Sequence, residues 1–168
     1  MPGDQNGTTL LRTFSCTGKV VSAHADPVTL VRMTEHQRVK DDYDQVWCVF
    51  DRDDVPAEQF NAAMQLAEHL GILVAYSNEA FELWYVLHFQ YLDTAISRDD
   101  YKTQLTSHLG VAYCKNDPDM YSTLLSKQGD AIRNARRLYE QYSPHRPEQD
   151  NPSTTVHLLV DALNRFVH

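Results

Sequence analysis

Two aspartates follow an apolar run in the first half of the chain. Residues 46–50, Val-Trp-Cys-Val-Phe, lead directly into Asp51, Arg52 and Asp53. Such a run is typical of a strand buried on both faces, as in parallel sheets, whose carboxyl ends face the ligand crevice of an open α/β domain. Because strand side chains alternate, we expect Asp51 and Asp53 to point the same way, which suits Mg²⁺. An acidic turn that caps the next helix fits equally well, so both interpretations stay open.

A third carboxylate, Glu82, falls in a stretch with apolar or aromatic residues on nearly every side. We expect a buried helix over residues 79–89, with Asn78 as its N-cap. A carboxylate there is costly unless it meets a metal, a cation or several hydrogen-bond donors. Glu79 and Glu82 share a face at the start of this helix, at the sheet edge where the two aspartates are expected to emerge.

Two other groups of residues have ordinary structural explanations. His88 lies on the aromatic face of the same helix, where a hydrogen-bonded core histidine is more common than a metal ligand. A basic stripe, formed by Lys127, Arg133, Arg136 and Arg137, is usually a solvated face, and contact with phosphate is the alternative.

The composition is that of a globular protein, with 42% hydrophobic and 10% aromatic residues in a chain of 168. The formal net charge of −8 argues against a basic surface that wraps nucleic acid, although metal ions at a site neutralise phosphates locally. No apolar run approaches the roughly 18 residues of a membrane span, and no signal-peptide pattern is present. The three cysteines have no paired metal-ligand spacing, so we expect a cytoplasmic protein without a membrane partner.

Capping residues and hydrophobic spacing predict the remaining elements. Asp26-Pro27 and Ser97-x-x-Asp100 are typical helix starts, and Gly71 and Gly110 are typical helix ends. The predicted elements are strands over residues 14–23 and 72–76, helices over 27–40, 56–70, 97–109 and 118–142, and a closing helix capped by residue 153 or 154. Strand, helix and strand over residues 46–76 form a predicted βαβ unit.

Four stretches together resemble the RloB family. They are the strand and acidic turn over residues 46–54, the segment 75–89 with Ser-Asn-Glu-Ala-Phe-Glu near its start, Tyr113-x-Lys115, and Asn-Pro-Ser-Thr-Thr-Val over 151–156. The likeness extends from about residue 18 onward. That family is similar to Toprim domains, the metal-binding α/β modules of topoisomerases, primases and overcoming-lysogenization-defect nucleases. Its members are typically encoded in restriction and anti-phage loci, often beside an ABC-type ATPase.

The resemblance implies an α/β fold of the Toprim-like, Rossmann-like kind, with a mostly parallel sheet flanked by helices and a helical C-terminal part. We therefore expect a Toprim-like core over residues 14–92 and a helical portion over 93–168 that packs on it as part of a single domain. Residues 1–13 are expected to be a disordered tail.

The resemblance also implies a divalent-metal-dependent nuclease that hydrolyses DNA or RNA in anti-phage defence, with Mg²⁺ or Mn²⁺ as cofactor. Transferred by motif, the implied metal ligands are Asp51, Asp53 and Glu82, with Glu82 alternatively an acid/base. The implied phosphate contacts are Arg52, Asn78 and Lys115, with Lys115 also expected to act in catalysis. The implied partners are a nucleic-acid substrate and a separate ABC-type ATPase subunit, and a homo-oligomer is compatible. No Walker phosphate loop or G-x-G-x-x-G is present, so we expect no nucleotide or NAD site.

One departure from the family pattern bears on activity. The family normally begins with a strand followed by E-G-x-x-T-E, whose first glutamate is the Toprim acid/base or metal ligand. Residues 1–32 contain no match, and the first glutamate is Glu35, inside a predicted helix. We expect either a truncated form or a lost leading strand, and a weak enzyme or a metal-binding remnant.

Two further interpretations follow. A non-catalytic, partner-binding subunit is favoured by the acidic charge and the missing glutamate. A phosphatase of the haloacid-dehalogenase kind fits Asp51-Arg52-Asp53-Asp54-Val55, in which Asp51 would be the nucleophile. Its remaining roles would fall to Ser77, Lys115 and Asp117 or Asp119.

Overall fold

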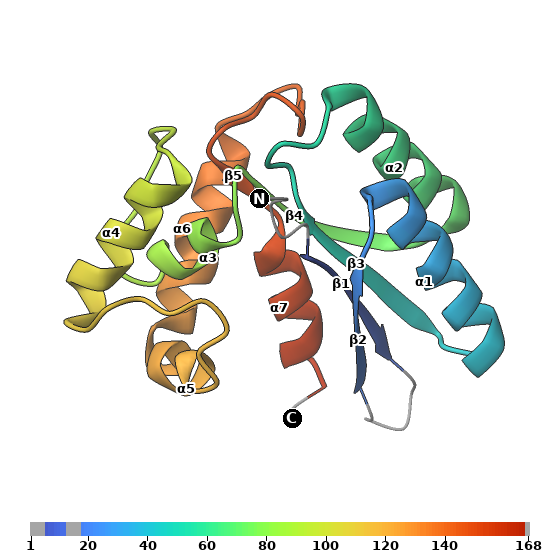
Figure 1. Cartoon of the computed structure of the whole chain (residues 1–168), viewed down its shortest axis with the longest axis horizontal. Helices are drawn as coiled ribbons and strands as arrows, with labels where there is room; N and C mark the ends of the chain where they lie inside the picture. Colours follow the sequence, from blue (N-terminus) through green and yellow to red (C-terminus); the bar gives the residue numbers. More distant parts are fainter. Residues whose placement is uncertain (1–5, 13–17, 167–168) are drawn as a thin grey trace. The chain divides into compact units, whose positions relative to one another are not determined.

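The computed structural model describes residues 6–12 and 18–166, with side chains from residue 19 onward (Figure 1). It divides the chain into two compact units. The first comprises residues 1–76 and 162–168, and the second comprises residues 77–161. The part of the chain that is described contains no helix long and apolar enough to cross a membrane.

The sheet has five strands in the order β2-β1-β3-β4-β5. The strands of the first unit are β1 (Asn6–Arg12), β2 (Gly18–His24), β3 (Gln45–Asp51) and most of β4 (Leu73–Asn78). β1 pairs antiparallel with both β2 and β3. The sheet is therefore mixed, and the prediction of a mostly parallel sheet is wrong. Arg12 is the register partner of Gly18, and residues 13–17 are too few for the crossover that parallel strands need.

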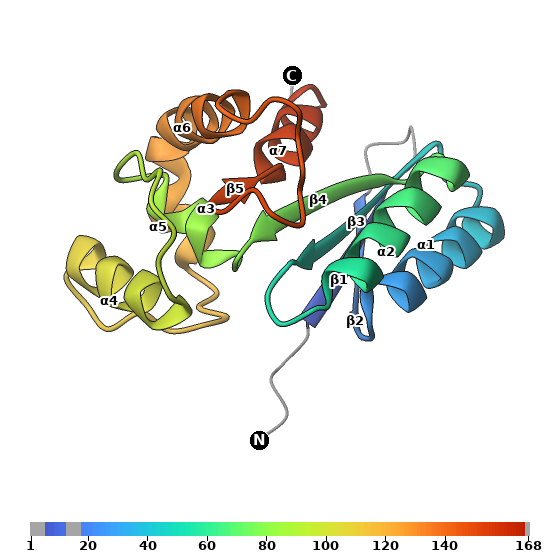
Figure 2. The ribbon, with the colours of Figure 1, turned by 90° about the horizontal axis from the view of Figure 1, so that it is seen from above.

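Two helices cover one face of these strands, as Figure 2 shows. α1 (Pro27–Asp41) begins as predicted, with Asp26 Oδ1 accepting a hydrogen bond from the Thr29 amide at 3.0 Å. α2 (Ala57–Leu70) ends as predicted at Gly71, whose φ of 67° places it in the left-handed region. The buried core between helices and strands consists of Leu30, Val31, Val46, Cys48, Phe50, Val55, Phe60, Ala63, Ala67, Ile72 and Tyr76. β3 also buries Trp47 on its other face, which agrees with the predicted strand buried on both faces.

The second unit is mainly helical. Its elements are α3 (Glu82–Val86), α4 (Arg98–Leu109), α5 (Met120–Leu124), the 3₁₀ turn η1 (Leu125–Lys127), α6 (Gln128–Glu140), β5 (Ser153–Thr154) and α7 (Val156–Asn164), which runs into the first unit. The end of β4 pairs antiparallel with β5, with Ser77 opposite Thr154. α4 has the predicted capping box, in which Ser97 Oγ accepts from the Asp100 amide at 3.2 Å.

Several elements differ from their predictions. Residues 6–12, expected to lack regular structure, form β1. Of the strand predicted over 14–23, residues 14–17 lie outside the described part, and β2 begins at residue 18. The helix predicted over 118–142 is divided into α5, η1 and α6, and Gly129, a weak helix former, lies just after the break. The helix predicted over 79–89 is only α3, because β4 continues to Asn78.

Candidate functional site

The first candidate carboxylates lie where β3 ends. Asp51 is the last residue of β3, and Asp53 lies in the following turn with a φ of 32°. Both side chains are partly exposed. Because extended backbone stops at Asp51, the alternation of strand side chains does not fix the direction of Asp53 relative to Asp51. Strand alternation therefore does not show that Asp51 and Asp53 point the same way, and their joint metal site stays a prediction.

Arg52 stabilises the turn that carries these aspartates. Its Nη1 donates to the backbone oxygen of Asp53 at 3.1 Å and to the backbone oxygen of Val55. Its guanidinium also lies over the Phe60 ring, 6.0 Å from the centroid. These contacts give Arg52 a structural role between β3 and α2, and its predicted phosphate contact is untested.

Glu82 is buried, as predicted, with 4% of its surface exposed. Its Oε1 accepts a hydrogen bond from the Tyr113 hydroxyl at 3.2 Å. An ionised carboxylate has about four acceptor positions, so one hydrogen bond leaves acceptor capacity for a cation or for water. A carboxylate held in this way is the kind of group that can bind a hard metal ion or move a proton.

Three tyrosines surround this carboxylate, and we call Glu82, Tyr85, Tyr101 and Tyr113 the Glu82–tyrosine cluster. Burial raises the pKa of all three phenols, and the negative charge of Glu82 raises each pKa further. The rings of Tyr85 and Tyr113 lie 6.3 Å apart. All three phenols therefore keep their protons at neutral pH and can act as hydrogen-bond donors. Sequence reasoning missed this cluster, although Tyr113 stands in the Tyr-x-Lys motif.

The Tyr113 hydrogen bond also bears on Lys115. Lys115 is exposed, two residues beyond Tyr113 on the loop between α4 and α5. The hydrogen bond from Tyr113 thus ties the loop that carries Lys115 to Glu82. Asn78 is buried instead, and its Nδ2 donates to the Pro147 carbonyl at 3.2 Å. Asn78 therefore anchors the loop before β5. It is the last residue of β4 and does not cap a helix, so that prediction is wrong. Its phosphate contact stays a prediction.

Comparison with known proteins identifies the family. The model of the family described as RloB-like protein matches residues 9–163. The chain belongs to the RloB-like family. Searches of curated proteins and of solved structures found no significant match. The predicted recognition is thus confirmed, whereas nuclease activity, metal dependence and a defence role need separate tests.

The leading glutamate of the RloB pattern has no equivalent among the described residues of the first unit. Glu35, the first glutamate of the sequence, lies in α1, where its Oε2 pairs with Arg38 Nη2 at 2.6 Å. That ion pair is a partly buried contact within one helix.

Three carboxylates of this RloB-like chain are each suitable as a ligand of magnesium. Asp51, Asp53 and Glu82 all offer hard carboxylate oxygens, and Glu82 has acceptor capacity to spare. The described residues include no group of three or more His, Cys, Asp or Glu side chains arranged to hold a metal ion. A magnesium ion bound at Glu82 would draw further ligands from water and substrate phosphate, as this ion commonly does.

His88 is a hydrogen-bonded buried residue, as predicted. Its Nδ1 donates to the Trp84 carbonyl at 2.9 Å, and its ring meets the Trp84 indole edge-on with centroids 4.9 Å apart. Burial lowers the pKa of His88, so its imidazole is neutral at pH 7. Ser77, which the phosphatase interpretation includes, is buried, and its Oγ shares a hydrogen bond with Thr154 Oγ1 at 3.0 Å.

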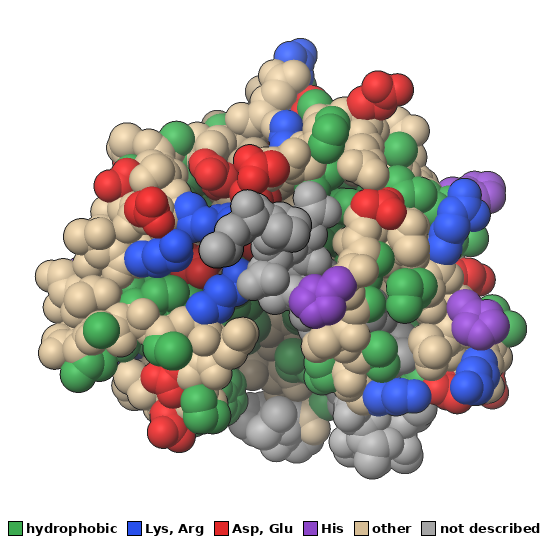
Figure 3. Space-filling model, viewed as in Figure 1, with side chains coloured by type: hydrophobic (Ala, Val, Ile, Leu, Met, Phe, Trp, Pro, Cys, Tyr) green, Lys and Arg blue, Asp and Glu red, His purple; other side chains and the backbone are tan. Residues whose placement is uncertain are grey.

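The basic stripe on η1 and α6 has two ion-paired members and two that lie over aromatic rings. Arg133 pairs with Asp130, Arg136 Nη2 pairs with Asp161 at 3.0 Å, and the guanidinium of Arg137 lies 4.0 Å from the Tyr91 ring centroid. Figure 3 shows acidic side chains beside basic ones on the face in view. The stripe thus resembles a solvated, ion-paired face.

Proposed function

We propose that this RloB-like protein is a divalent-metal-dependent nuclease that hydrolyses phosphodiester bonds. The observation that carries the proposal is the hydrogen bond from Tyr113 to buried Glu82, which joins two motifs of the family and brings the loop of Lys115 to a carboxylate. Burial of the Glu82 carboxylate costs stability, and a catalytic role explains why it is there.

Each residue has a proposed role. Asp51 and Asp53 hold Mg²⁺ or Mn²⁺, and Glu82 is a further ligand or the acid/base. A bound divalent ion supplies charge to polarise the phosphate and lowers the pKa of the attacking water. Lys115 stabilises negative charge on the phosphate, and Tyr113 orients Glu82. We further propose anti-phage defence with an ABC-type ATPase as partner, on family resemblance alone.

The test is a cleavage assay on supercoiled DNA, single-stranded DNA and RNA. Wild type is expected to cut at least one substrate with Mg²⁺ or Mn²⁺ and to stop in EDTA. Asp51→Ala and Glu82→Gln are expected to lower the rate by about 100-fold or more, the usual effect of losing an acid/base or ligand. Asp54→Ala, at an exposed position of the same turn, is the matched control and should stay within about threefold.

Failure to cut any of these substrates with either metal would count against the nuclease. So would cleavage that survives Asp51→Ala and Glu82→Gln together. Circular dichroism of every variant separates lost chemistry from lost folding.

A non-catalytic, partner-binding protein is the second candidate. The ion pair of Glu35 with Arg38 favours it, because the first glutamate of the sequence is engaged within α1 and so does not replace the leading glutamate expected for the family. This candidate expects an unchanged biological effect for Asp51→Ala in a plaque assay, whereas the nuclease expects protection to be lost.

A further inference from the structure

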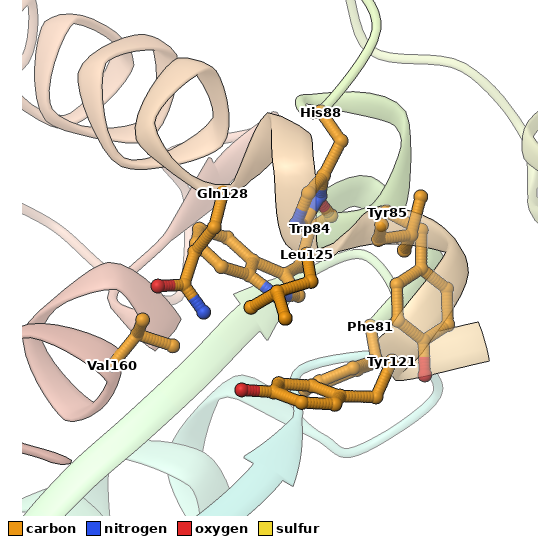
Figure 4. A pocket seen from close by; sticks show the side chains of 9 residues that line it. Phe81, Trp84, Tyr85, His88, Tyr121, Leu125, Gln128 and Val160 are labelled. Atoms are coloured by element: carbon orange, nitrogen blue, oxygen red, sulfur yellow. The ribbon is translucent and has the colours of Figure 1, made fainter. Parts of the chain in front are cut away.

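The second unit contains a small pocket beside α3, shown in Figure 4. Its volume is about 180 Å³. Six of its lining residues matter here: Phe81, Trp84, Tyr85, His88, Tyr121 and Gln128. Pockets that bury drug-sized ligands measure roughly 300–1,000 Å³, so this one suits a single ring system.

The walls are mostly aromatic. Trp84 is buried, with 6% of its surface exposed, whereas Tyr121 is 68% exposed and stands at the rim. Figure 4 shows the Tyr121 hydroxyl and the Gln128 amide extending toward the same side of the pocket, beside Val160. An exposed aromatic rim over a buried aromatic wall suits a flat ligand that stacks.

Two side chains add polar groups to these walls. The Gln128 amide carries two donors and a carbonyl acceptor. The His88 ring donates through Nδ1 to the Trp84 carbonyl, so in the neutral ring Nε2 is an acceptor. The edge of a heteroaromatic ring presents donors and acceptors that match an amide and an imidazole nitrogen.

The pocket adjoins the Glu82–tyrosine cluster. Tyr85 belongs to both, and its ring lies 5.3 Å from that of Phe81 and 6.3 Å from that of Tyr113, which donates to Glu82. Residues that line the pocket are therefore in ring contact with the hydroxyl donor of the candidate catalytic carboxylate. A ligand bound in this pocket would therefore lie close to Glu82, the proposed catalytic carboxylate.

The charge of the protein points to the same class of ligand. The chain has 23 acidic and 15 basic residues, and Arg133 and Arg136 are ion-paired. Neutralising a phosphate backbone is the usual source of nucleic-acid affinity, and the net charge of −8 and these ion pairs reduce that contribution. Base stacking is the remaining source, and it contributes without a basic surface.

We propose that this pocket binds one unpaired purine or pyrimidine base. The inference deepens the proposed nuclease function and rests on it for the origin of the base, since it assigns the substrate class: single-stranded nucleic acid, or an unpaired nucleotide in it. A base within a duplex is stacked and paired, so it cannot enter without being extruded.

The test follows tryptophan fluorescence in EDTA, where no cleavage occurs. Adenosine and single-stranded oligonucleotides are titrated into the wild-type protein, and quenching is expected. Trp84→Phe should remove the response, since Trp47, the other tryptophan, lies outside the pocket. Tyr121→Ala should weaken binding about tenfold, as expected for one lost stacking contact. Gln65→Ala, an exposed glutamine on α2, is the matched control for Gln128→Ala.

Oligonucleotides with abasic sites and fully paired duplexes are the decisive comparisons. Equal quenching by either one, no effect of Tyr121→Ala and Gln128→Ala, or equally tight binding of a linear alkanol would overturn the inference. Tighter binding of an oligonucleotide than of adenosine would support single-stranded nucleic acid as the ligand. Equal binding would overturn that substrate class, because it would mean that the pocket binds a free nucleoside equally well.

The binding assay separates this inference from the proposed function. Base-dependent quenching by a protein that cuts nothing would retain the pocket and reject the nuclease. Metal-dependent cleavage unchanged by Tyr121→Ala and Gln128→Ala, with no quenching, would retain the nuclease and reject the pocket.

Discussion

The two units hold their candidate carboxylates in opposite ways. In the first unit, Asp51 and Asp53 lie partly exposed around a turn that Arg52 stabilises. In the second unit, Glu82 is buried, and its Oε1 accepts a hydrogen bond from the Tyr113 hydroxyl. Water stabilises the first pair at no cost to folding, whereas burial of Glu82 costs free energy. The comparison teaches that Glu82 is the carboxylate whose presence most needs a functional explanation.

The largest change in stability is expected from a substitution that disrupts the apolar packing of the first unit. Phe60 is fully buried and meets Phe50 and Tyr76 edge-on, with ring centroids 5.6 Å and 5.7 Å away. Phe60→Ala should lower the free energy of unfolding by about 3–5 kcal/mol, measured by urea denaturation. Val39→Ala, at a position that is 72% exposed, should change it by less than about 0.5 kcal/mol. A loss below about 1 kcal/mol for Phe60→Ala would contradict this account of the core.

The next prediction concerns the polar packing of the second unit. Tyr113→Phe removes the donor to buried Glu82 and should cost about 1–3 kcal/mol of unfolding free energy. In a Glu82→Gln background, Tyr113→Phe should lower the free energy of unfolding by less, because a neutral amide is stabilised less by the donor than a carboxylate is. A double-mutant cycle measures this coupling, with Tyr121→Phe at the exposed rim as control. A coupling near zero would show that the hydrogen bond adds nothing to stability.

Acid should destabilise the protein as two buried histidines take up protons. Burial is the main cause that lowers the pKa of both His88 and His157, although Asp130 opposes it at His88, and Asp161 and Glu140 oppose it at His157. Near pH 6.5, His88 and His157 therefore bind protons in the unfolded chain more readily than in the folded chain. The stability these histidines contribute is present above pH 6.5 and is lost as the pH falls toward their folded pKa values.

Urea denaturation at pH 7.5, 6.5 and 5.5 measures this loss, at most about 1.4 kcal/mol per pH unit for each histidine. The positive charge of Arg136 also lowers the pKa of His157. Asp26 and Asp100, whose pKa values lie below the ordinary 3.8, titrate outside this range. His157→Gln should flatten the profile, whereas His24→Gln, at an exposed position, should leave it unchanged.

The smallest effect is expected at Tyr101. Its hydroxyl is fully buried and has no hydrogen-bond partner within the described part of the chain. Tyr101→Phe should therefore leave stability unchanged or raise it by up to about 1 kcal/mol, in contrast to Tyr113→Phe. Thermal denaturation of the two variants side by side makes the comparison, and a clear loss for Tyr101→Phe would reveal a partner such as bound water.

Local signals in the sequence predicted much of the fold. Asp26, Gly71 and the Ser97–Asp100 box act through residues three or four positions away, so their effects can be read from the chain itself. β1 and β5 could not be found in this way. The pairing partner of β5 lies far along the sequence, as Thr154 opposite Ser77 illustrates. β1 is a short strand, and short strands carry little periodicity.

The candidate site was predictable in part. Apolar surroundings correctly indicated a buried Glu82, because burial follows from the residues around it. The donor from Tyr113 could not be derived, since it depends on how the loop after α4 folds back within the second unit. The alternation expected for Asp51 and Asp53 failed because strand periodicity ends with the strand, and the sequence does not mark that residue.

The exposure of Cys114, between the tyrosine that binds Glu82 and the candidate catalytic lysine, provides a chemical handle. Cys48 is buried, so in a Cys16→Ser background a thiol-reactive dye attaches selectively at residue 114. The emission of that dye would follow the loop directly when metal or oligonucleotide is added, without any need for turnover.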